Sequence, residues 1–346
     1  MTGHQEGLSV TSMRNLKEPD ISVILPVYNG ALYLKESVDS ILNQTFQNFE
    51  VIILNDGSTD SSEDIIKSYA DSRIIYIKQE NCGLALTLNR GIEKARGKYI
   101  ARQDQDDISL PDRFDHQIAF LEKNPDVAVV GCWAKILSDN DKGEFYDRHP
   151  DDYSSILIDL LFDNPIVHSS AMIRKSVLYD VGLYTTDKNR QPPEDYELWS
   201  RIARKYQLNN IPEVLHLYRQ VPSGMSNDSL NPFFEKVFRI SQENIAYYAG
   251  RDVDDPVVWS ITELTHGCKH EKRRLAPYRK IKKAMKNIWS SISMQSITSK
   301  QNKDKWLKLN NQMHLNYFKY RLGKGIGYLI TESVFFFRKI GGHIKK

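Results

Sequence analysis

Three carboxylates stand close together in one short segment of this 346-residue sequence. Asp104, Asp106 and Asp107 end the run from Gly97 to Asp107, and the apolar part of that run predicts a short strand. Open α/β sheets bind ligands at the carboxyl ends of their strands, which is where this strand would deliver the three side chains. Crowded carboxylates repel one another unless a divalent cation, a proton or full solvation relieves them. The run therefore indicates a site for a cation that also binds phosphates. The alternative is a solvated loop at the start of a helix.

An EF-hand is a poor interpretation of the same run. That calcium loop needs glycine at its sixth position and glutamate at its twelfth. Counting from Asp104, these positions hold Ser109 and Asp115.

The elements that must position the carboxylates alternate along the chain. Apolar runs bounded by turn residues predict strands at 21–27, 49–54, 74–77, 99–101 and 127–130. Helical patterns occupy 61–69, 84–95 and 113–123, and Asp60, three residues before Glu63, predicts an N-terminal cap for the first of them. Alternating strands and helices predict an α/β fold, with a mostly parallel sheet covered by helices on both faces.

Several short motifs follow one another in a fixed order over about residues 20 to 220. They are Pro26-Val27-Tyr28-Asn29, Asn55-Asp56-Gly57-Ser58, Asn81-Cys82-Gly83-Leu84, Leu88-Asn89-Arg90-Gly91, the Asp104 run with Leu110-Pro111-Asp112-Arg113, and Pro193-Glu194-Asp195-Tyr196-Glu197-Leu198-Trp199. With this ordered set the chain resembles the family 2 glycosyltransferases, inverting enzymes of the GT-A fold that move a sugar from a nucleotide diphosphate donor. The Ala101-Arg102 and Leu110-to-Arg113 segments most resemble the exopolysaccharide and surface-glycan branch.

The resemblance implies a nucleotide site at the ends of the first strands. Its members would be Pro26, Val27, Tyr28, Asn29, Asp56, Arg102 and Asp104. The Tyr28 ring suits packing against a base, and the Asp56 carboxylate suits the imide N–H of uracil. From the residues alone, an ordinary strand-to-helix turn at Tyr28 and an Asx turn before Gly57 remain as alternatives.

The resemblance also implies a bound cation, Mg or Mn. Asp106 would coordinate it, Asp104 would share it or hold the ribose, and diphosphate oxygens would complete the shell. The cation would act as a Lewis acid on the leaving nucleoside diphosphate. Asp107 would support the metal ligands without binding the cation itself, contact the sugar or acceptor, or cap the helix that begins near Pro111.

Two positions depart from the family pattern. Leu88 replaces an arginine that many relatives carry, so Arg102 or Arg90 would have to supply that phosphate contact. Val221 stands where relatives often have a histidine that serves as an extra metal ligand, which would leave the cation more dependent on phosphate.

Asp195 is the predicted general base, with Glu194 raising its pKa or orienting the acceptor. Displacement at the anomeric carbon requires removal of a proton from the acceptor hydroxyl, a task that suits a carboxylate. The alternative is structural, because Glu194, Asp195 and Glu197 also fit the acidic first turn of an amphipathic helix.

His168 is a further candidate for contact with the sugar or acceptor, with a purely structural histidine as the alternative. Trp133 and Trp199 are predicted to lie in the core.

Composition and cysteine usage predict one catalytic domain with an appendage. We expect a flexible arm at 1–18, a GT-A catalytic domain at 19–222 and a basic helical region at 223–346. The three cysteines are far apart and form no metal or redox motif, which suits a reducing cytoplasm, and no signal peptide is visible.

Charge is divided unequally along the chain. From Lys269 onward 20 lysines and arginines face three acids, a net of +17, and since the whole chain carries +3 the remainder carries −14. Aromatic residues are interleaved, and the apolar stretch 326–337 is too short to span a bilayer but suits its surface. We expect peripheral association with an anionic membrane on its cytoplasmic, inner face, where a lipid-linked acceptor is found. Nucleic acid is the competing partner, disfavoured because no nucleic-acid motif accompanies the charge.

The predicted function is therefore metal-dependent transfer of one sugar from a nucleotide donor, a UDP-sugar, to a glycan or lipid-linked acceptor. Processive synthesis is disfavoured because the chain has neither transmembrane helices nor a Gln-x-x-Arg-Trp motif. The other hypotheses are an inactive relative that acts as a binding or scaffold module, and a nucleic-acid-binding protein.

Overall fold

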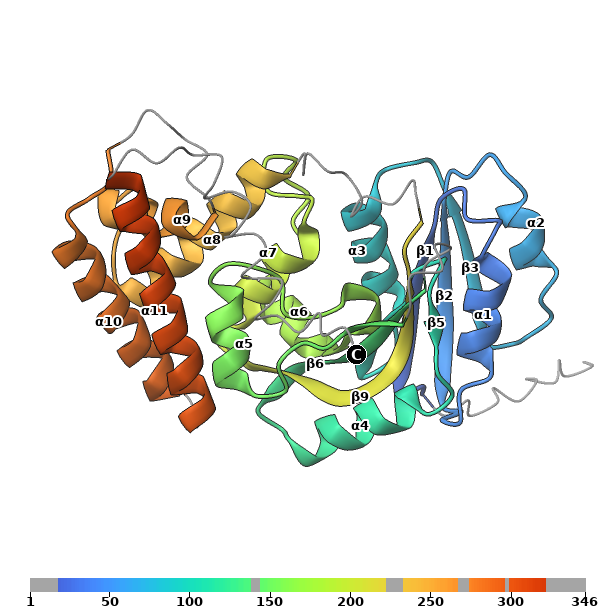
Figure 1. Cartoon of the computed structure of the whole chain (residues 1–346). Helices are drawn as coiled ribbons and strands as arrows, with labels where there is room; N and C mark the ends of the chain where they lie inside the picture. Colours follow the sequence, from blue (N-terminus) through green and yellow to red (C-terminus); the bar gives the residue numbers. More distant parts are fainter. Residues whose placement is uncertain (1–17, 138–143, 222–232, 267–273, 296–298, 322–346) are drawn as a thin grey trace, which may run out of the picture.

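One curved sheet of nine strands runs through the molecule (Figure 1). The computed structural model describes residues 18–137, 144–221, 233–266, 274–295 and 299–321. The strands are β1 Ile21–Val27, β2 Phe49–Asp56, β3 Ile74–Gln79, β4 Tyr99–Arg102, β5 Ile108–Ser109, β6 Val127–Leu137, β7 Phe145–Asp147, β8 Met172–Arg174 and β9 Gln207–Arg219. Their order is β3-β2-β1-β4-β8-β6-β9-β5, with β7 paired to β6.

The register of the parallel strands sets the position of the site. Strands β3, β2, β1 and β4 are parallel neighbours, β6 and β9 are parallel to each other, and β5, β7 and β8 run against their neighbours. Val27 pairs with Asn55, and Ile24 pairs with Arg102. The segments that follow β1, β2 and β4 therefore leave the sheet at one edge, which is the edge predicted to bind the nucleotide.

Helices cover both faces because successive side chains of a strand point to opposite sides. On β1, Val23 and Leu25 face one core with α1 (Leu34–Leu42), α2 (Ser62–Lys67) and α4 (Arg113–Lys123). Ile24 faces the other core with α3 (Leu84–Lys94). The five predicted strands and three predicted helices are confirmed, and β2, β3, β4 and β6 extend beyond their predicted ends.

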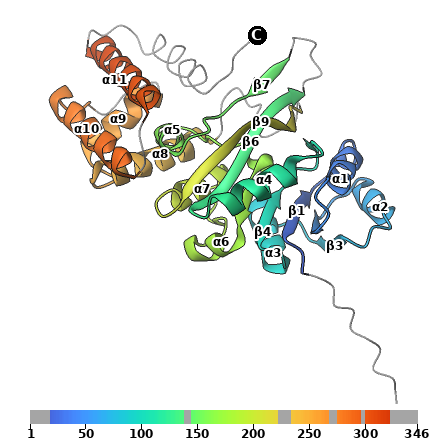
Figure 2. The same cartoon turned by 90° about the horizontal axis from the view of Figure 1, so that it is seen from below.

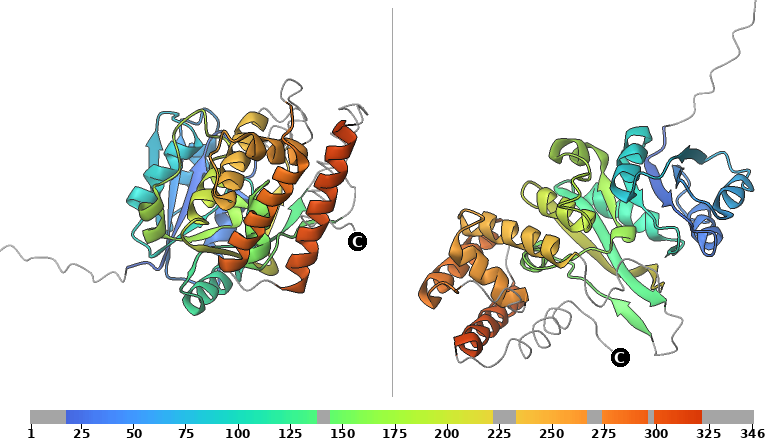
Figure 3. Two further views of the ribbon diagram at one scale, coloured as in Figure 1. Left: turned by 90° about the vertical axis from the view of Figure 1, so that its left-hand side faces the viewer. Right: turned by 90° about the horizontal axis from the view of Figure 1, so that it is seen from above.

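The second half of the chain adds a helical layer to the α3 side of the sheet. Its helices are α5 Tyr153–Leu160, the short 3₁₀ helix His168–Ser170, α6 Lys175–Val181, α7 Glu194–Ile202, α8 Phe234–Ala249, α9 Pro256–His266, α10 Tyr278–Gln295 and α11 Lys300–Arg321. Figures 2 and 3 show α8 to α11 gathered at the end of the molecule away from β3. None of the helices in the described ranges is long and apolar enough to cross a membrane.

The helices beyond residue 222 share a core with the sheet. One buried cluster contains Ile24 of β1 and Leu157 of α5 together with Ile281 of α10 and Trp306 of α11. Asn302 of α11 donates from Nδ2 to Asp152 Oδ1 at 2.9 Å and accepts from Ser155 Oγ at 2.6 Å. One of the two buried clusters therefore continues past residue 222, while the other lies wholly within residues 19–222. The boundary at 222 stays a prediction.

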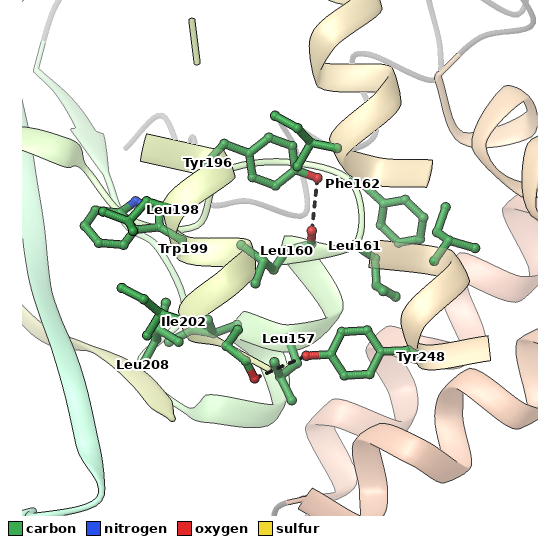
Figure 4. Close-up of a cluster of buried hydrophobic side chains, with 14 of the residues drawn as sticks. Leu157, Leu160, Leu161, Phe162, Tyr196, Leu198, Trp199, Ile202, Leu208 and Tyr248 are labelled. Carbon is green, nitrogen blue, oxygen red and sulfur yellow. Dashed lines mark hydrogen bonds between the residues drawn. The ribbon is translucent and has the colours of Figure 1, made fainter. Parts of the chain in front are cut away.

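Helix α7 is held by this shared core. Figure 4 shows Trp199 and Ile202 of α7 in one buried cluster with Leu157 and Leu160 of α5 and Tyr248 of α8. Tyr196 is buried, and its hydroxyl donates to the carbonyl of Leu160 at 3.0 Å. The burial of Trp199 confirms its predicted place in the core, whereas Trp133 is only partly buried. The buried part of α7 therefore anchors its first turn, which carries Glu194 and Asp195.

Candidate active site

The turn after β1 is shaped by side chains from two neighbouring segments. Tyr28, half exposed, donates its N–H to Gln105 Oε1 at 2.9 Å, and Gln105 Nε2 donates back to the Tyr28 carbonyl at 3.1 Å. Asn29 has a φ of 49°, in the left-handed region that asparagine tolerates, and its Oδ1 accepts from the Thr59 N–H at 2.8 Å. A Cβ at Gly30 would lie 2.3 Å from Gln105 Oε1. Pro26 and Val27 belong to β1 itself, with Val27 buried, so they shape the floor of this turn.

Asp60 joins this turn to the next helix. Its Oδ1 accepts from the Ser62 N–H at 3.0 Å at the start of α2, and its Oδ2 accepts from the Ala31 N–H at 2.9 Å. The residue at the cap position is Ser61, so Asp60 serves the helix start from one residue further out than predicted.

The Asp56 carboxylate is buried and organises the loop after β3. Oδ1 accepts from Gln79 Nε2 at 2.7 Å and from the Cys82 N–H at 2.9 Å, while Oδ2 accepts from the Gly83 N–H at 3.0 Å. Burial raises the pKa of Asp56, but these donors outweigh it and the pKa is lowered overall. Asp56 is therefore an anion, and its Oδ2 accepts one hydrogen bond from the described residues.

Arg102 links the acidic run to the opposite side of the site. Its Nη2 donates to Asp104 Oδ1 at 2.5 Å, Nη1 donates to the Gln103 carbonyl at 2.7 Å, and Nε donates to His168 Nε2 at 3.2 Å. The side chain is only 1% exposed. These partners occupy the guanidinium and fix Asp104, and a direct contact of Arg102 with the nucleotide stays a prediction.

The Asp106 carboxylate lacks a side-chain donor within the described part of the chain. Burial raises the pKa of Asp106 to about 7, and the neighbouring Asp104 and Asp107 add to the rise. Among the described residues, no group of three or more His, Cys, Asp or Glu side chains is arranged to hold a metal ion. A half-buried carboxylate without a donor, next to the part-exposed Asp104, fits a hard divalent cation that takes its remaining oxygens from a diphosphate.

The surroundings of Asp107 are not those expected of a residue that contacts the sugar or acceptor. It is 1% exposed; its Oδ2 lies 3.1 Å from His216 Nε2, and its Oδ1 accepts from the Arg219 N–H at 2.8 Å. It is not a helix cap either, because α4 begins after Asp112. Asp107 therefore ties the acidic run to β9, and its pKa is lowered because the hydrogen bond and charge of His216 outweigh burial.

Buried polar residues that sequence reasoning missed hold the backbone of the acidic run. Gln103 Nε2 donates to the Asp107 carbonyl at 2.8 Å. Arg113 is fully buried and donates to Gln103 Oε1, Ser109 Oγ and the Arg102 carbonyl at 3.0, 2.7 and 2.8 Å. A buried arginine requires such a set of acceptors, but the motif Leu110-to-Arg113 gave no sign of where its side chain points.

Glu194 and Asp195 lie side by side at the first turn of α7. Asp195 Oδ2 accepts from Asn164 Nδ2 at 2.7 Å, and Oδ1 accepts from the Tyr196 N–H at 2.7 Å. Burial raises the pKa of Asp195 to about 6 and that of Glu194 to about 7, and in Glu194 the charge of Asp195 adds to the rise. A buried carboxyl pair that titrates near neutrality has the chemistry of a general base.

His168 lies between the two groups of carboxylates. Its Nε2 meets Arg102 Nε and is 2.9 Å from the Tyr184 hydroxyl, while its Nδ1 is 3.7 Å from Glu194 Oε1 and 4.0 Å from Asp195 Oδ2. Burial and the charge of Arg102 hold the pKa of His168 well below its usual range. His168 is therefore a neutral imidazole beside the predicted base.

The motif around Leu88 has a structural role. Leu88 is buried in α3, and Asn89 exchanges two hydrogen bonds with the backbone of Tyr184, at 2.8 and 2.9 Å. Arg90 is exposed and donates to Gln79 Oε1 at 2.9 Å, near the Asp56 loop. Of the two predicted substitutes for the missing arginine, Arg90 is the one with a free approach to solvent.

Comparison with known proteins identifies relatives over most of the chain. Residues 22–182 match the model of glycosyl transferase family 2. An uncharacterized glycosyltransferase of Haemophilus influenzae is 33% identical over 297 residues, covering 81% of this chain and 89% of that protein. One from Rickettsia prowazekii is 36% identical over 64% of this chain and 70% of its own length. Among solved structures, residues 1–349 of S. aureus TarS in complex with UDP-GlcNAc share the fold with a TM-score of 0.56 at 17% identity, covering 88% of this chain and 92% of that one.

Proposed function

The chain belongs to glycosyl transferase family 2 and has the GT-A fold, and we propose that it transfers one sugar, with inversion, from a UDP-sugar to a hydroxyl of a glycan or lipid-linked acceptor. One observation carries this proposal. Arg102 and His168 connect two sets of carboxylates, Asp104 with its neighbour Asp106 on the donor side and Glu194 with Asp195 on the other.

Support for a uridine donor comes from the edge formed by β1 and β2. The half-exposed Tyr28 ring can pack against a base, and Asp56 keeps acceptor capacity on Oδ2 for an imide N–H. Asn29, exposed on its left-handed turn, completes this side of the site. S. aureus TarS, which shares the fold, was solved with UDP and with UDP-GlcNAc.

Asp106 and Asp104 would hold a divalent cation, Mg or Mn, together with the donor diphosphate. The cation, when bound, would neutralise charge on the leaving nucleoside diphosphate. The chain's own part is to hold Asp104 in place through Arg102 and to keep the acidic run folded through Gln103 and Arg113.

Asp195 would take the proton of the acceptor hydroxyl as that oxygen attacks the anomeric carbon from the face opposite the leaving group. Asn164 fixes Oδ2 of this carboxylate, and the Tyr196 N–H fixes Oδ1. Glu194, with its higher pKa, would orient the acceptor. Burial raises the pKa of Asp195 and so makes it a stronger base than an exposed aspartate.

We also propose that the enzyme works on surface glycans at the inner face of the cytoplasmic membrane, held there by charge. Arg279, Lys280, Lys282, Lys283 and Lys286 are exposed on α10. None of the five forms an ion pair with another described residue. The buried positions of α10, Ile281, Met285 and Ile288, lie on the opposite face, so the basic face is exposed with respect to the described residues and would meet anionic lipid headgroups.

A screen of nucleotide sugars against the purified full chain tests the function. We expect release of nucleoside diphosphate from one UDP-sugar, which stops in excess chelator and accelerates when an acceptor is added. Tight donor binding without release or transfer would instead identify an inactive binding protein. A salt-sensitive mobility shift of short RNA without donor binding would identify a nucleic-acid-binding protein.

A further inference from the structure

His168 is held by two donors that converge on one ring nitrogen. Arg102 Nε donates to Nε2 at 3.2 Å, and the Tyr184 hydroxyl lies 2.9 Å from the same atom. The guanidinium carries only donors, so Nε2 must accept. A neutral imidazole that accepts at Nε2 carries its proton on Nδ1.

The Nδ1 atom faces the carboxyl pair of α7. Its distances to Glu194 Oε1 and Asp195 Oδ2, 3.7 and 4.0 Å, are somewhat longer than a hydrogen bond. Catalytic hydrogen bonds are often long before substrate binds and shorten in the complex. The charged and titratable groups around the ring are Arg102 from β4, Tyr184 from the segment before α7, and Glu194 and Asp195 from α7.

Tyr184 is fixed in turn by α3. It is 3% exposed, its N–H donates to Asn89 Oδ1 at 2.9 Å, and its carbonyl accepts from Asn89 Nδ2 at 2.8 Å. The Tyr184 and His168 rings are 5.5 Å apart, and the Trp199 ring meets the imidazole edge-on at 6.0 Å. The ring therefore has little freedom to rotate.

We infer that Arg102 and Tyr184, the latter anchored by Asn89, fix His168 as a neutral imidazole whose Nδ1–H holds the Glu194–Asp195 pair in place. Tyr184, Asn89 and His168 are positioning residues in this inference, which rests on the proposed role of Asp195 as base. It also gives Arg102 a second task, because the same guanidinium orients Asp104 on the donor side.

NMR of the full-length protein with ¹⁵N-labelled histidine rings tests the tautomer without any assay of transfer. His168 is assigned by its loss in His168→Gln. We expect Nδ1 protonated and Nε2 unprotonated from about pH 5.5 to 8, with no titration in that range. A proton on Nε2, or a charged ring above about pH 6, would overturn the inference even if the enzyme transfers sugar.

Two substitutions at His168 separate the roles of its nitrogens. Asparagine reaches about as far as Nδ1 and can donate toward the carboxyl pair, whereas glutamine reaches about as far as Nε2 and can accept from Arg102. If the Nδ1–H holds the base, His168→Gln should shift the acidic limb of the kcat profile to higher pH, and His168→Asn should leave it near the wild-type position. The reverse order would contradict the assignment.

Tyr184→Phe tests the second donor. We expect kcat to fall by roughly 3- to 10-fold, which corresponds to the loss of one hydrogen bond. The KM for the donor should not change, and the acidic limb of the kcat profile should shift to higher pH. Tyr248→Phe is the matched control, because Tyr248 is also 3% exposed and its hydroxyl lies 3.5 Å from the Ala203 carbonyl, outside the site. If both variants lose thermal stability alike and neither changes the pH profile, Tyr184 is structural only.

Discussion

A base at Asp195 must be deprotonated before it can accept the acceptor's proton, so activity should fall as the pH drops below about 6. Asp195→Asn keeps the size of the side chain and its hydrogen bond with Asn164 but cannot take a proton. We expect kcat to fall by roughly 10² or more with nearly unchanged donor affinity. Steady-state kinetics and donor titration check this, with Asp126→Asn on the exposed surface as control.

An equal loss of donor affinity would show that Asp195 is structural. NMR of the product supplies a second check. The new bond should have the anomeric configuration opposite to that of the donor, and retention would exclude a single displacement.

Asp106 is predicted to be the principal ligand of the cation. Asp106→Asn removes the charge and leaves most of the shape, so it should abolish most transfer while the fold remains intact, and excess chelator should do the same to the wild-type enzyme. Full activity in chelator would refute the metal assignment. Circular dichroism melting of the variant separates loss of the cation from loss of the fold.

Glu194 links function to stability. Its pKa is raised from 4.5 to about 7 in the folded chain, so the folded state binds more protons than the unfolded chain between these values. Its contribution to stability is complete below about pH 4 and is lost as the pH rises through about 7. Glutamine cannot ionise, so Glu194→Gln should not lose stability as the pH rises. We expect the variant to be more stable than wild type at pH 8 by about 1–3 kcal/mol but not at pH 4.5.

Denaturant unfolding at both pH values measures the difference. The same variant should transfer sugar more slowly if Glu194 orients the acceptor. A stability gain that is equal at both pH values would mean that Glu194 is not protonated in the folded enzyme near neutrality.

At the scale of elements, the loop after β4 depends on one buried arginine. Arg113→Lys keeps a positive charge, but an ammonium has three donors on one atom, whereas the guanidinium donates from three nitrogens to Gln117, Gln103, Ser109 and the Arg102 carbonyl. We expect a loss of roughly 2–4 kcal/mol in the free energy of unfolding and weaker donor binding, because the acidic run would lose its shape. Arg239→Lys, at a half-exposed ion pair, should cost less than about 1 kcal/mol in the same thermal melts.

The alternation of apolar and helical segments was sufficient to predict β1 to β4, α3 and α4, because local pattern determines such elements. It did not predict β8, a three-residue strand that runs against β4 and β6. Nor did it predict that Asn89 pairs with Tyr184, 95 residues away. The carboxylates could be predicted from local motifs. The buried groups that orient them could not, because their contacts are set by tertiary packing between segments far apart in the sequence.

At the scale of the whole molecule, α8 to α11 form part of the folding unit. Trp289 and Trp306 stack at 5.5 Å, and Trp306 is 5% exposed, so these two aromatics serve the core and are not membrane anchors. Deletion from Lys269 would remove α10 and α11 from the shared core. We expect that truncation to abolish soluble expression, which makes it unsuitable as a test of membrane binding. The apolar stretch 326–337 lies outside the described residues.

Charge reversal on the exposed face of α10 tests membrane association in the intact fold. Each basic residue near an anionic surface contributes about 1 kcal/mol, so Lys282→Glu with Lys286→Glu should weaken binding to phosphatidylglycerol vesicles by roughly 10- to 100-fold. Lys94→Glu with Lys123→Glu makes the same change in net charge on exposed positions of other helices and should have little effect.

Cosedimentation at low and high salt checks this prediction, since the interaction is screened over about 10 Å at 0.1 M salt. Transfer to a small soluble acceptor should survive in both double variants, because α10 does not contribute to the proposed site. Equal binding of the wild-type chain to neutral and anionic vesicles would refute electrostatic anchoring. Equal weakening by both pairs would mean that net charge, rather than the face of α10, governs the association.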